Sequence, residues 1–227
     1  MRFCQSGTTV RTVWIVLSSL GILLQLLLIA EIPRGAWKRF KALSAYLLVL
    51  FLTTVIEAAA FYDPEVYART WKFYWLHDAI RQALIYVVVL SFIHKSLERN
   101  PGRTGAKFLI WGGGAFFLIV SIVAAYDPRK GYWMTNLSRN LGFLAVVLNF
   151  LLWAVLMQER KKDRVLLMLT GAMGLQMAGK AIGHALRLIS KTLVTPGDFI
   201  IVFCHIVCLY GWLCALRIDR SRAPGLE

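Results

Sequence analysis

Charged residues are scarce in this chain, and acidic residues are the scarcest of them. Only 17% of the 227 residues are charged, with 12 Asp and Glu against 26 Lys and Arg, whereas 58% are hydrophobic. A soluble domain of this size is closer to half apolar. The shortage of charge excludes an ordinary soluble globular protein, and the excess of apolar residues predicts a chain that is embedded in lipid.

Cysteine is rare as well, and its spacing carries no metal or disulfide pattern. Cys4 stands alone near the beginning of the chain, while Cys204, Cys208 and Cys214 lie in the last apolar run. The absence of a paired CxxC pattern excludes a zinc-finger site, and the spacing excludes a disulfide framework. We interpret the three late cysteines as small packing residues of one helix.

The sequence also lacks the common motifs of catalytic and cofactor-binding sites. It contains no P-loop, no GxSxG elbow and no dinucleotide-binding glycine fingerprint, so we expect no cofactor. The last apolar run has no lysine, which excludes a retinal protein of the usual kind. Basic residues form short clusters between apolar runs, without a basic face interleaved with aromatics, so we expect no nucleic-acid partner.

Seven apolar runs are long enough to cross a hydrocarbon core of about 30 Å as helices. The first run is too long for a signal peptide and no small-residue cleavage site follows it, so we interpret it as a membrane helix. Short connections that contain Pro or Gly leave no room for a second domain. The sequence therefore predicts an all-α integral membrane bundle, a single domain over residues 1–227, with helices near 12–31, 42–62, 73–94, 107–126, 137–157, 164–188 and 198–217.

Basic residues are unevenly distributed between the connections. They are concentrated after the first, third and fifth runs and in the C-terminal tail. Cytoplasmic loops carry an excess of Lys and Arg, so this distribution predicts an outside N-terminus and a cytoplasmic C-terminus. Aromatic residues crowd the opposite boundary, near residues 61–75 and 126–133, where they would anchor the helices at the membrane interface.

The sixth run carries a polar stripe. Gln176, Lys180, His184 and Arg187 recur at spacings of four, four and three, which places them on one face of a helix. A lysine near the hydrocarbon core is costly and usually faces a bundle interior or a water-filled cavity. On the same helix, residues 179–183 form a GxxxG pattern, which predicts a close helix–helix contact on the face that flanks Lys180.

Polar residues of other runs fall at a similar depth on the outward side of the predicted bundle. Asp78 and Glu57 are the expected counter-ions of Lys180, and the remaining surplus of positive charge would suit a small anion such as a carboxylate. The alternative is a structural salt-bridge network that binds nothing. The candidate ligand-binding residues are Glu57, His77, Asp78, Arg81, Gln82, Arg139, Asn140, Gln176, Lys180, His184 and His205.

Two other classes of function remain open. Three histidines, His77, His184 and His205, lie with Asp78 at a depth that would allow a membrane-embedded zinc hydrolase of the ceramidase type. The last run has no HxxxH, however, and a hydrogen-bonded structural role is more typical of each histidine. A small-molecule transporter is favoured by a weak repeat, since residues 59–64 and 124–128 both end a run with aromatic-Asp-Pro.

The whole chain resembles small bacterial seven-helix membrane proteins that have no soluble domain and no assigned function. The resemblance is carried by residues 74–75, 85–86 and 93–95, by Arg99 in a basic loop, by Arg139 at the start of the fifth run and by the short basic tail. More distantly, the chain is similar to the seven-helix sensory segments that precede bacterial signalling domains. No such domain follows Glu227, so a sensory role implies a separate signalling partner.

These observations favour one hypothesis over the others. We expect a multi-pass protein of the bacterial cytoplasmic membrane that binds or senses a small ligand through an outward-facing polar cluster. Its partners would be the lipid bilayer, a small anionic ligand and a signalling protein. An enzymatic activity is the less expected outcome.

Overall fold

The described part of the protein is helical almost throughout. The computed structural model describes residues 8–62, 80–96, 104–125, 133–158 and 163–221. Within these ranges every residue except Phe40, Asp163 and Ser190 is helical, and no strand occurs. The expectation of an all-α fold is confirmed.

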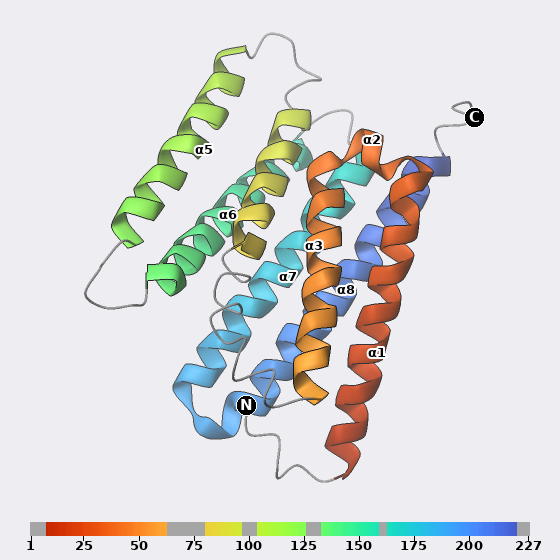
Figure 1. Ribbon diagram of the computed structural model, residues 1–227. Helices are drawn as coiled ribbons and strands as arrows, with labels where there is room; N and C mark the ends of the chain where they lie inside the picture. The colour runs from red at the N-terminus through yellow and green to blue at the C-terminus, as the bar shows by residue number, and fades with distance from the viewer. Residues whose placement is uncertain (1–7, 63–79, 97–103, 126–132, 159–162, 222–227) are drawn as a thin grey trace.

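The long helices match the predicted apolar runs and alternate in direction along the chain (Figure 1). Short elements join some of them: a π-helical turn (Ile32–Ala36), α2 (Trp37–Arg39) and a 3₁₀ turn (Lys191–Leu193). The long helices are α1 (Thr8–Glu31), α3 (Lys41–Tyr62), residues 80–96, α5 (Thr104–Ala125), α6 (Trp133–Gln158), α7 (Arg164–Ile189) and α8 (Val194–Ser221).

Proline and glycine mark the ends of helices, but not always as the sequence predicts. Gly35 interrupts the chain after α1 with a φ of 123°, a conformation that residues with a Cβ rarely adopt. The expected connection at residues 196–197 is wrong, because both residues lie in the first turn of α8. Proline is tolerated there, since the first N–H groups of a helix have no intrahelical partner.

The start of α7 is fixed by a capping side chain. Asp163 Oδ1 accepts hydrogen bonds from the backbone N–H groups of Val165, at 3.1 Å, and Leu166, at 3.3 Å. A carboxylate at this position also interacts favourably with the positive end of the helix dipole. The cap fixes the first residue of α7 and thereby the positions of the polar residues further along this helix.

Glycines bring α7 and α8 into backbone contact. A Cβ added to Gly179 would lie 2.5 Å from both Cβ and Sγ of Cys204, and one added to Gly183 would lie 2.6 Å from the carbonyl oxygen of Gly197. No larger residue fits these positions without displacing a neighbour. The close contact predicted from the GxxxG pattern is confirmed, and α8 is the helix that makes it.

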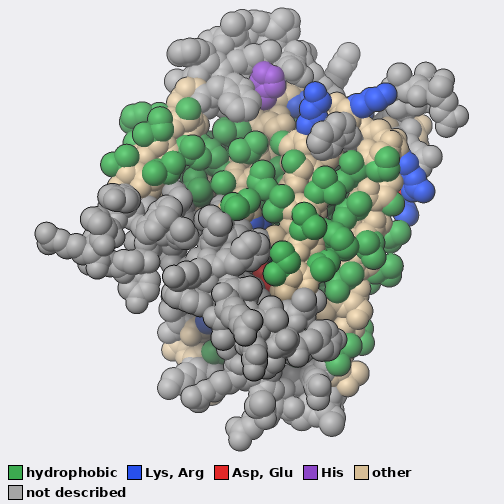
Figure 2. All heavy atoms as spheres, viewed as in Figure 1, with side chains coloured by type: hydrophobic (Ala, Val, Ile, Leu, Met, Phe, Trp, Pro, Cys, Tyr) green, Lys and Arg blue, Asp and Glu red, His purple; other side chains and the backbone are tan. Residues whose placement is uncertain are grey.

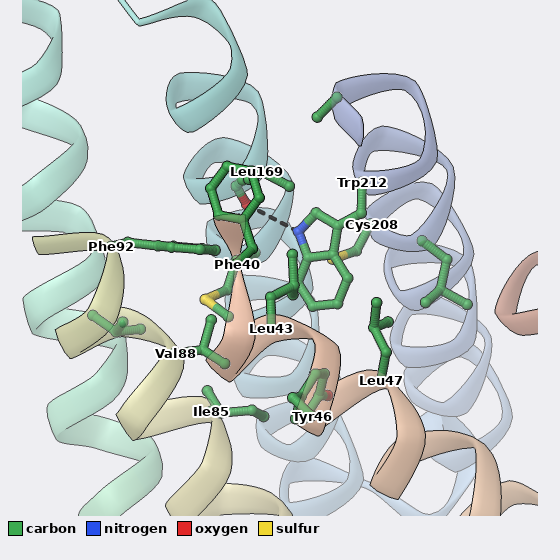
Figure 3. Packing of buried hydrophobic residues seen from close by; sticks show 14 of the residues in the cluster. Phe40, Leu43, Tyr46, Leu47, Ile85, Val88, Phe92, Leu169, Cys208 and Trp212 are labelled. Carbon is green, nitrogen blue, oxygen red and sulfur yellow. Dashed lines mark hydrogen bonds between the residues drawn. The ribbon is translucent and has the colours of Figure 1, made fainter. Parts of the chain in front are cut away.

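Trp212 of α8 is the largest fully buried side chain in the core. Its Nε1–H donates a hydrogen bond of 3.0 Å to the carbonyl oxygen of Leu169 on α7 (Figure 3). Its ring meets that of Tyr46 on α3 edge to face, with centroids 5.8 Å apart. A tryptophan that pairs its N–H while burying its rings links three helices at one point.

Apolar side chains cover much of the outer surface as well as filling the core. Large apolar side chains are exposed on outer faces, for example Ile15 of α1, Phe116 of α5 and Phe143 of α6, and they cover much of the face in Figure 2. Several polar side chains are buried, among them Asn149 and Gln176. Among the described residues, three helical stretches are long and apolar enough to cross a membrane, Thr12–Gly35, Arg164–Arg187 and Val194–Asp219, which indicates membrane association.

Replacing Gly183 tests the α7–α8 contact. We expect Gly183→Ala to destabilise the protein by about 1–3 kcal/mol, because the new Cβ overlaps the backbone of α8. The measurement is the apparent melting temperature of the purified protein in detergent.

The matched control is Gly112→Ala, since an added Cβ there has no neighbouring atom within 4 Å. A helical Gly→Ala change without a clash is neutral or slightly stabilising. Equal melting temperatures for the two variants would contradict the close contact.

Candidate functional site

The deepest residue of the predicted stripe forms a hydrogen bond to the neighbouring helix. Gln176 is buried on α7, and its Nε2 lies 2.9 Å from Nδ1 of His205 on α8. An amide N–H can only donate, so Nδ1 accepts and the imidazole is neutral with its proton on Nε2. This contact joins two candidate residues that are 29 positions apart in the sequence.

The imidazole of His205 lies within the electrostatic range of two basic side chains. The positive charges of Lys180 on α7 and Arg81 on the helix of residues 80–96 both act electrostatically on the ring. Lys180 also acts on the thiol of Cys208, one helical turn further along α8. Arg81, Gln176, Lys180 and His205 therefore belong to one group, which we call the polar cluster.

The polar cluster is rich in hydrogen-bond donors. A guanidinium and an ammonium group have only N–H donors, and the tautomer of His205 adds the N–H at Nε2. Gln176 Oε1 is an acceptor, and each basic side chain has further interactions of its own within the protein. Such a set of groups matches the chemistry of an anion that only accepts hydrogen bonds, such as a carboxylate or phosphate.

The outer part of the stripe lies in a different environment. Along α7 the burial decreases from Gln176 to the half-buried Lys180 and the exposed His184 as the helix approaches its end at Ile189. Arg187 is exposed and forms an ion pair with Asp198 of α8. That pair closes the end of the α7–α8 hairpin.

The remaining candidates are distributed around the bundle. Glu57 is exposed on α3, and Asn140 is half-buried on α6. Gln82 packs toward α6, where its Oε1 would lie 3.6 Å from a Cβ on Gly142. Arg139 belongs to the backbone of α6, but the structure does not describe its side chain. His77 and Asp78 lie outside the described residues. The predicted ion pair between Lys180 and Asp78 therefore stays a prediction.

The histidines do not form a metal centre within the described part of the chain. No group of three His, Cys, Asp or Glu side chains lies close enough to hold a metal ion among the residues that were placed. His205 is directed at Gln176, whereas His184 is exposed. The described residues thus offer no support for a zinc site.

A second buried polar contact was not among the predicted site residues. Asn149 of α6 donates from Nδ2 to the carbonyl oxygen of Thr170 on α7, at 3.0 Å. The Thr170 hydroxyl donates in turn to the carbonyl oxygen of Leu166, at 2.9 Å. The depth of Asn149 in its apolar run is the only sequence signal for this contact, which ties α6 to α7.

Comparisons of the chain with protein-family models, curated proteins and solved structures find no match.

A double-mutant cycle tests the hydrogen bond at the centre of the polar cluster. We expect Gln176→Leu and His205→Leu each to lower the free energy of unfolding by about 1–3 kcal/mol, since each leaves a buried polar partner unpaired. The double variant should cost less than the two single variants together, with a coupling of about 0.5–1.5 kcal/mol. Unfolding in mixed micelles provides the measurement.

The control cycle pairs His205→Leu with Leu175→Ala, because Leu175 precedes Gln176 but is exposed on the other side of α7. This cycle should be additive. A Gln176–His205 cycle that is equally additive would contradict the hydrogen bond.

Proposed function

We propose that the protein is a bundle of seven transmembrane helices in a bacterial cytoplasmic membrane, with its N-terminus outside. The long antiparallel helices and the apolar outer faces support this topology (Figure 1). Described basic residues lie at the end of the bundle where α1 and α8 end, in or just after the last turns of these helices, among them Arg34, Lys38, Arg39 and Arg217. Lys and Arg side chains are visible at this end in Figure 2. That end would face the cytoplasm by the positive-inside rule.

Within this topology, the polar cluster is the proposed binding site for a small anionic ligand. The observation that carries the proposal is that the charges of Arg81 and Lys180 both act on His205, which is hydrogen-bonded to Gln176 of the neighbouring helix. Basic side chains within a membrane are costly, and they usually mark the path or site of a substrate or ion. A carboxylate or phosphate would accept from the donors of the cluster and offset their charge.

Binding at this position would have a structural consequence. The residues of the cluster belong to α7, α8 and the helix of residues 80–96, so a ligand that contacts all three would favour one packing of these helices over another. A shift between two packings is how a sensing module transmits occupancy to a partner. We therefore propose a small-ligand binding or sensing module, with a signalling partner on the cytoplasmic side.

The transporter alternative has less support. Transport sites in helical bundles are commonly formed by discontinuous helices at the middle of the membrane. α7 and α8 continue without a break past Gln176 and His205. The aromatic-Asp-Pro repeat that favoured this alternative lies largely outside the described residues.

A thermal-stability screen with carboxylate and phosphate metabolites tests the binding proposal. A ligand that binds only the folded protein stabilises it by about 2.7 kcal/mol at a concentration 100 times its Kd. We expect at least one such compound to raise the melting temperature of the wild type. Lys180→Met should reduce this shift strongly, because it removes a charge of the cluster.

The matched control is Arg164→Met, which removes one positive charge from the opposite end of the same helix, where Arg164 is exposed. This variant should retain the full shift. The absence of a shift across the whole panel, or an equal loss in both variants, would count against the proposed site.

The orientation is tested with single cysteines introduced into a background in which Cys4, Cys204, Cys208 and Cys214 are replaced by Ser or Ala. A membrane-impermeant maleimide added to intact cells should label Thr195→Cys, at the exposed start of α8, but not Lys38→Cys, in the exposed α2. Both should be labelled after the membrane is disrupted. The reverse pattern in intact cells would overturn the orientation.

A further inference from the structure

A second group of basic side chains lies at the opposite end of the bundle from the polar cluster. Glu31, the last residue of α1, has a side chain that is only 6% exposed. Arg34 Nη1 lies 3.2 Å from Glu31 Oε1, and Arg217 Nε of α8 lies 3.9 Å from the same oxygen. One buried carboxylate oxygen thus lies within ion-pair distance of two guanidinium groups from different segments.

The two arginines remain accessible from outside the protein. Their side chains are 52% and 59% exposed, respectively, although both contact a buried acid. Each guanidinium carries five N–H donors, and the contact with Glu31 involves only part of them. Glu31 offsets one of the two positive charges, so a surplus positive charge and outward donors remain between α1 and α8.

Neighbouring contacts keep this end of the bundle in place. Arg39 of α2 forms an ion pair with Asp219 of α8. Lys95 Nζ donates to the carbonyl oxygen of Arg39, at 2.8 Å, and lies 3.7 Å from the centroid of the Phe40 ring. These contacts fix α2 against α8 and the helix of residues 80–96. The positions of Arg34 and Arg217 are therefore set by the fold.

The surface next to the two arginines is apolar. Tyr210 is exposed on α8 seven residues before Arg217, and seven residues correspond to two turns on the same helix face. Leu26 and Leu27 are exposed on α1, which packs beside α8 (Figure 1). A molecule with an anionic head and apolar chains matches a basic surface that adjoins an apolar one better than a free anion does.

We propose that Arg34 and Arg217 bind the phosphate of an anionic phospholipid whose acyl chains lie along α1 and α8. Guanidinium groups bind phosphate oxygens through paired N–H donors, and basic sites at the ends of membrane helices recognise anionic headgroups. The proposal rests on the membrane embedding proposed above but not on ligand binding at the polar cluster. A lipid in this place would connect the ends of α1 and α8.

The test uses the full chain in a neutral detergent, titrated with phosphatidylglycerol or with phosphatidylcholine of the same acyl chains. Native mass spectrometry measures bound lipid, and thermal unfolding measures stability. We expect phosphatidylglycerol to bind and stabilise the wild type, and Arg34→Gln combined with Arg217→Gln to weaken its affinity about tenfold or more. Equal binding of the two lipids to the wild type would overturn the proposal.

The charge-matched control combines Lys41→Gln with Arg164→Gln, two exposed residues at the starts of α3 and α7. It should retain the affinity for phosphatidylglycerol. If the control loses as much affinity as the Arg34→Gln, Arg217→Gln variant, the effect comes from general surface charge and the proposed site is overturned. Inorganic phosphate alone forms a third arm. Stabilisation by phosphate equal to that by the lipid would overturn the assignment to a lipid.

Two further variants keep the outcomes distinct. Arg217→Gln alone leaves Glu31 its contact with Arg34, so it replaces the double variant if the latter does not fold, and unchanged affinity would contradict the proposal. Lys180→Met should bind phosphatidylglycerol like the wild type. A failure of the proposed ligand site and a failure of the lipid site are therefore separable.

Discussion

The close approach of α7 and α8 is the constraint on which the described structure depends. Gly179 and Gly183 leave no side chain between the two backbones, so Cys204 and the backbone of Gly197 pack directly against α7. In lipid there is little hydrophobic gain from helix association, and close van der Waals packing with interhelical hydrogen bonds holds helices together. The glycine contact also fixes the register of the two helices over their whole length.

That register determines which polar groups meet. It places Gln176 opposite His205 and the carbonyl oxygen of Leu169 opposite the indole N–H of Trp212. Trp212 then reaches Tyr46 of α3, and Asn149 of α6 reaches Thr170 on another face of α7. These contacts pair several buried polar groups between helices, while large apolar side chains occupy both the core and the outer faces. This arrangement is what a hydrocarbon environment requires.

The described chain has two charged regions of different construction. Near Lys180 the basic groups are half-buried, and their charges act on the imidazole of a neighbouring helix. Near Glu31 they are exposed and held by a buried acid. The first arrangement suits a small ligand enclosed between helices, and the second suits a headgroup that arrives from the membrane surface.

Much of the fold follows from the sequence because it depends on local composition. Where the helix ends are described, the length of the apolar runs predicts them to within a few residues, and the small residues at 179 and 183 indicate a close neighbour. The identity of that neighbour does not follow, because partners such as Cys204 or His205 depend on the register between distant segments.

The same limit applies to the candidate site. Helical spacing places Gln176, Lys180 and His184 on one face, but it does not say how far along that face the bundle extends. His184 is therefore exposed while Gln176 is buried. Proline at 196 was misplaced for a related reason, since the sequence alone does not distinguish a loop from the first turn of a helix.

The most direct measurement of the central claim is the ¹⁵N NMR signal of the His205 ring in the protein reconstituted in lipid, assigned by comparison with His205→Leu. The account predicts an unprotonated Nδ1 that accepts a hydrogen bond, with a signal that moves when Gln176 is replaced in Gln176→Leu. A protonated Nδ1 would contradict the assigned direction of this hydrogen bond, and a signal that Gln176→Leu leaves unchanged would contradict the pairing of α7 and α8 on which the polar cluster rests.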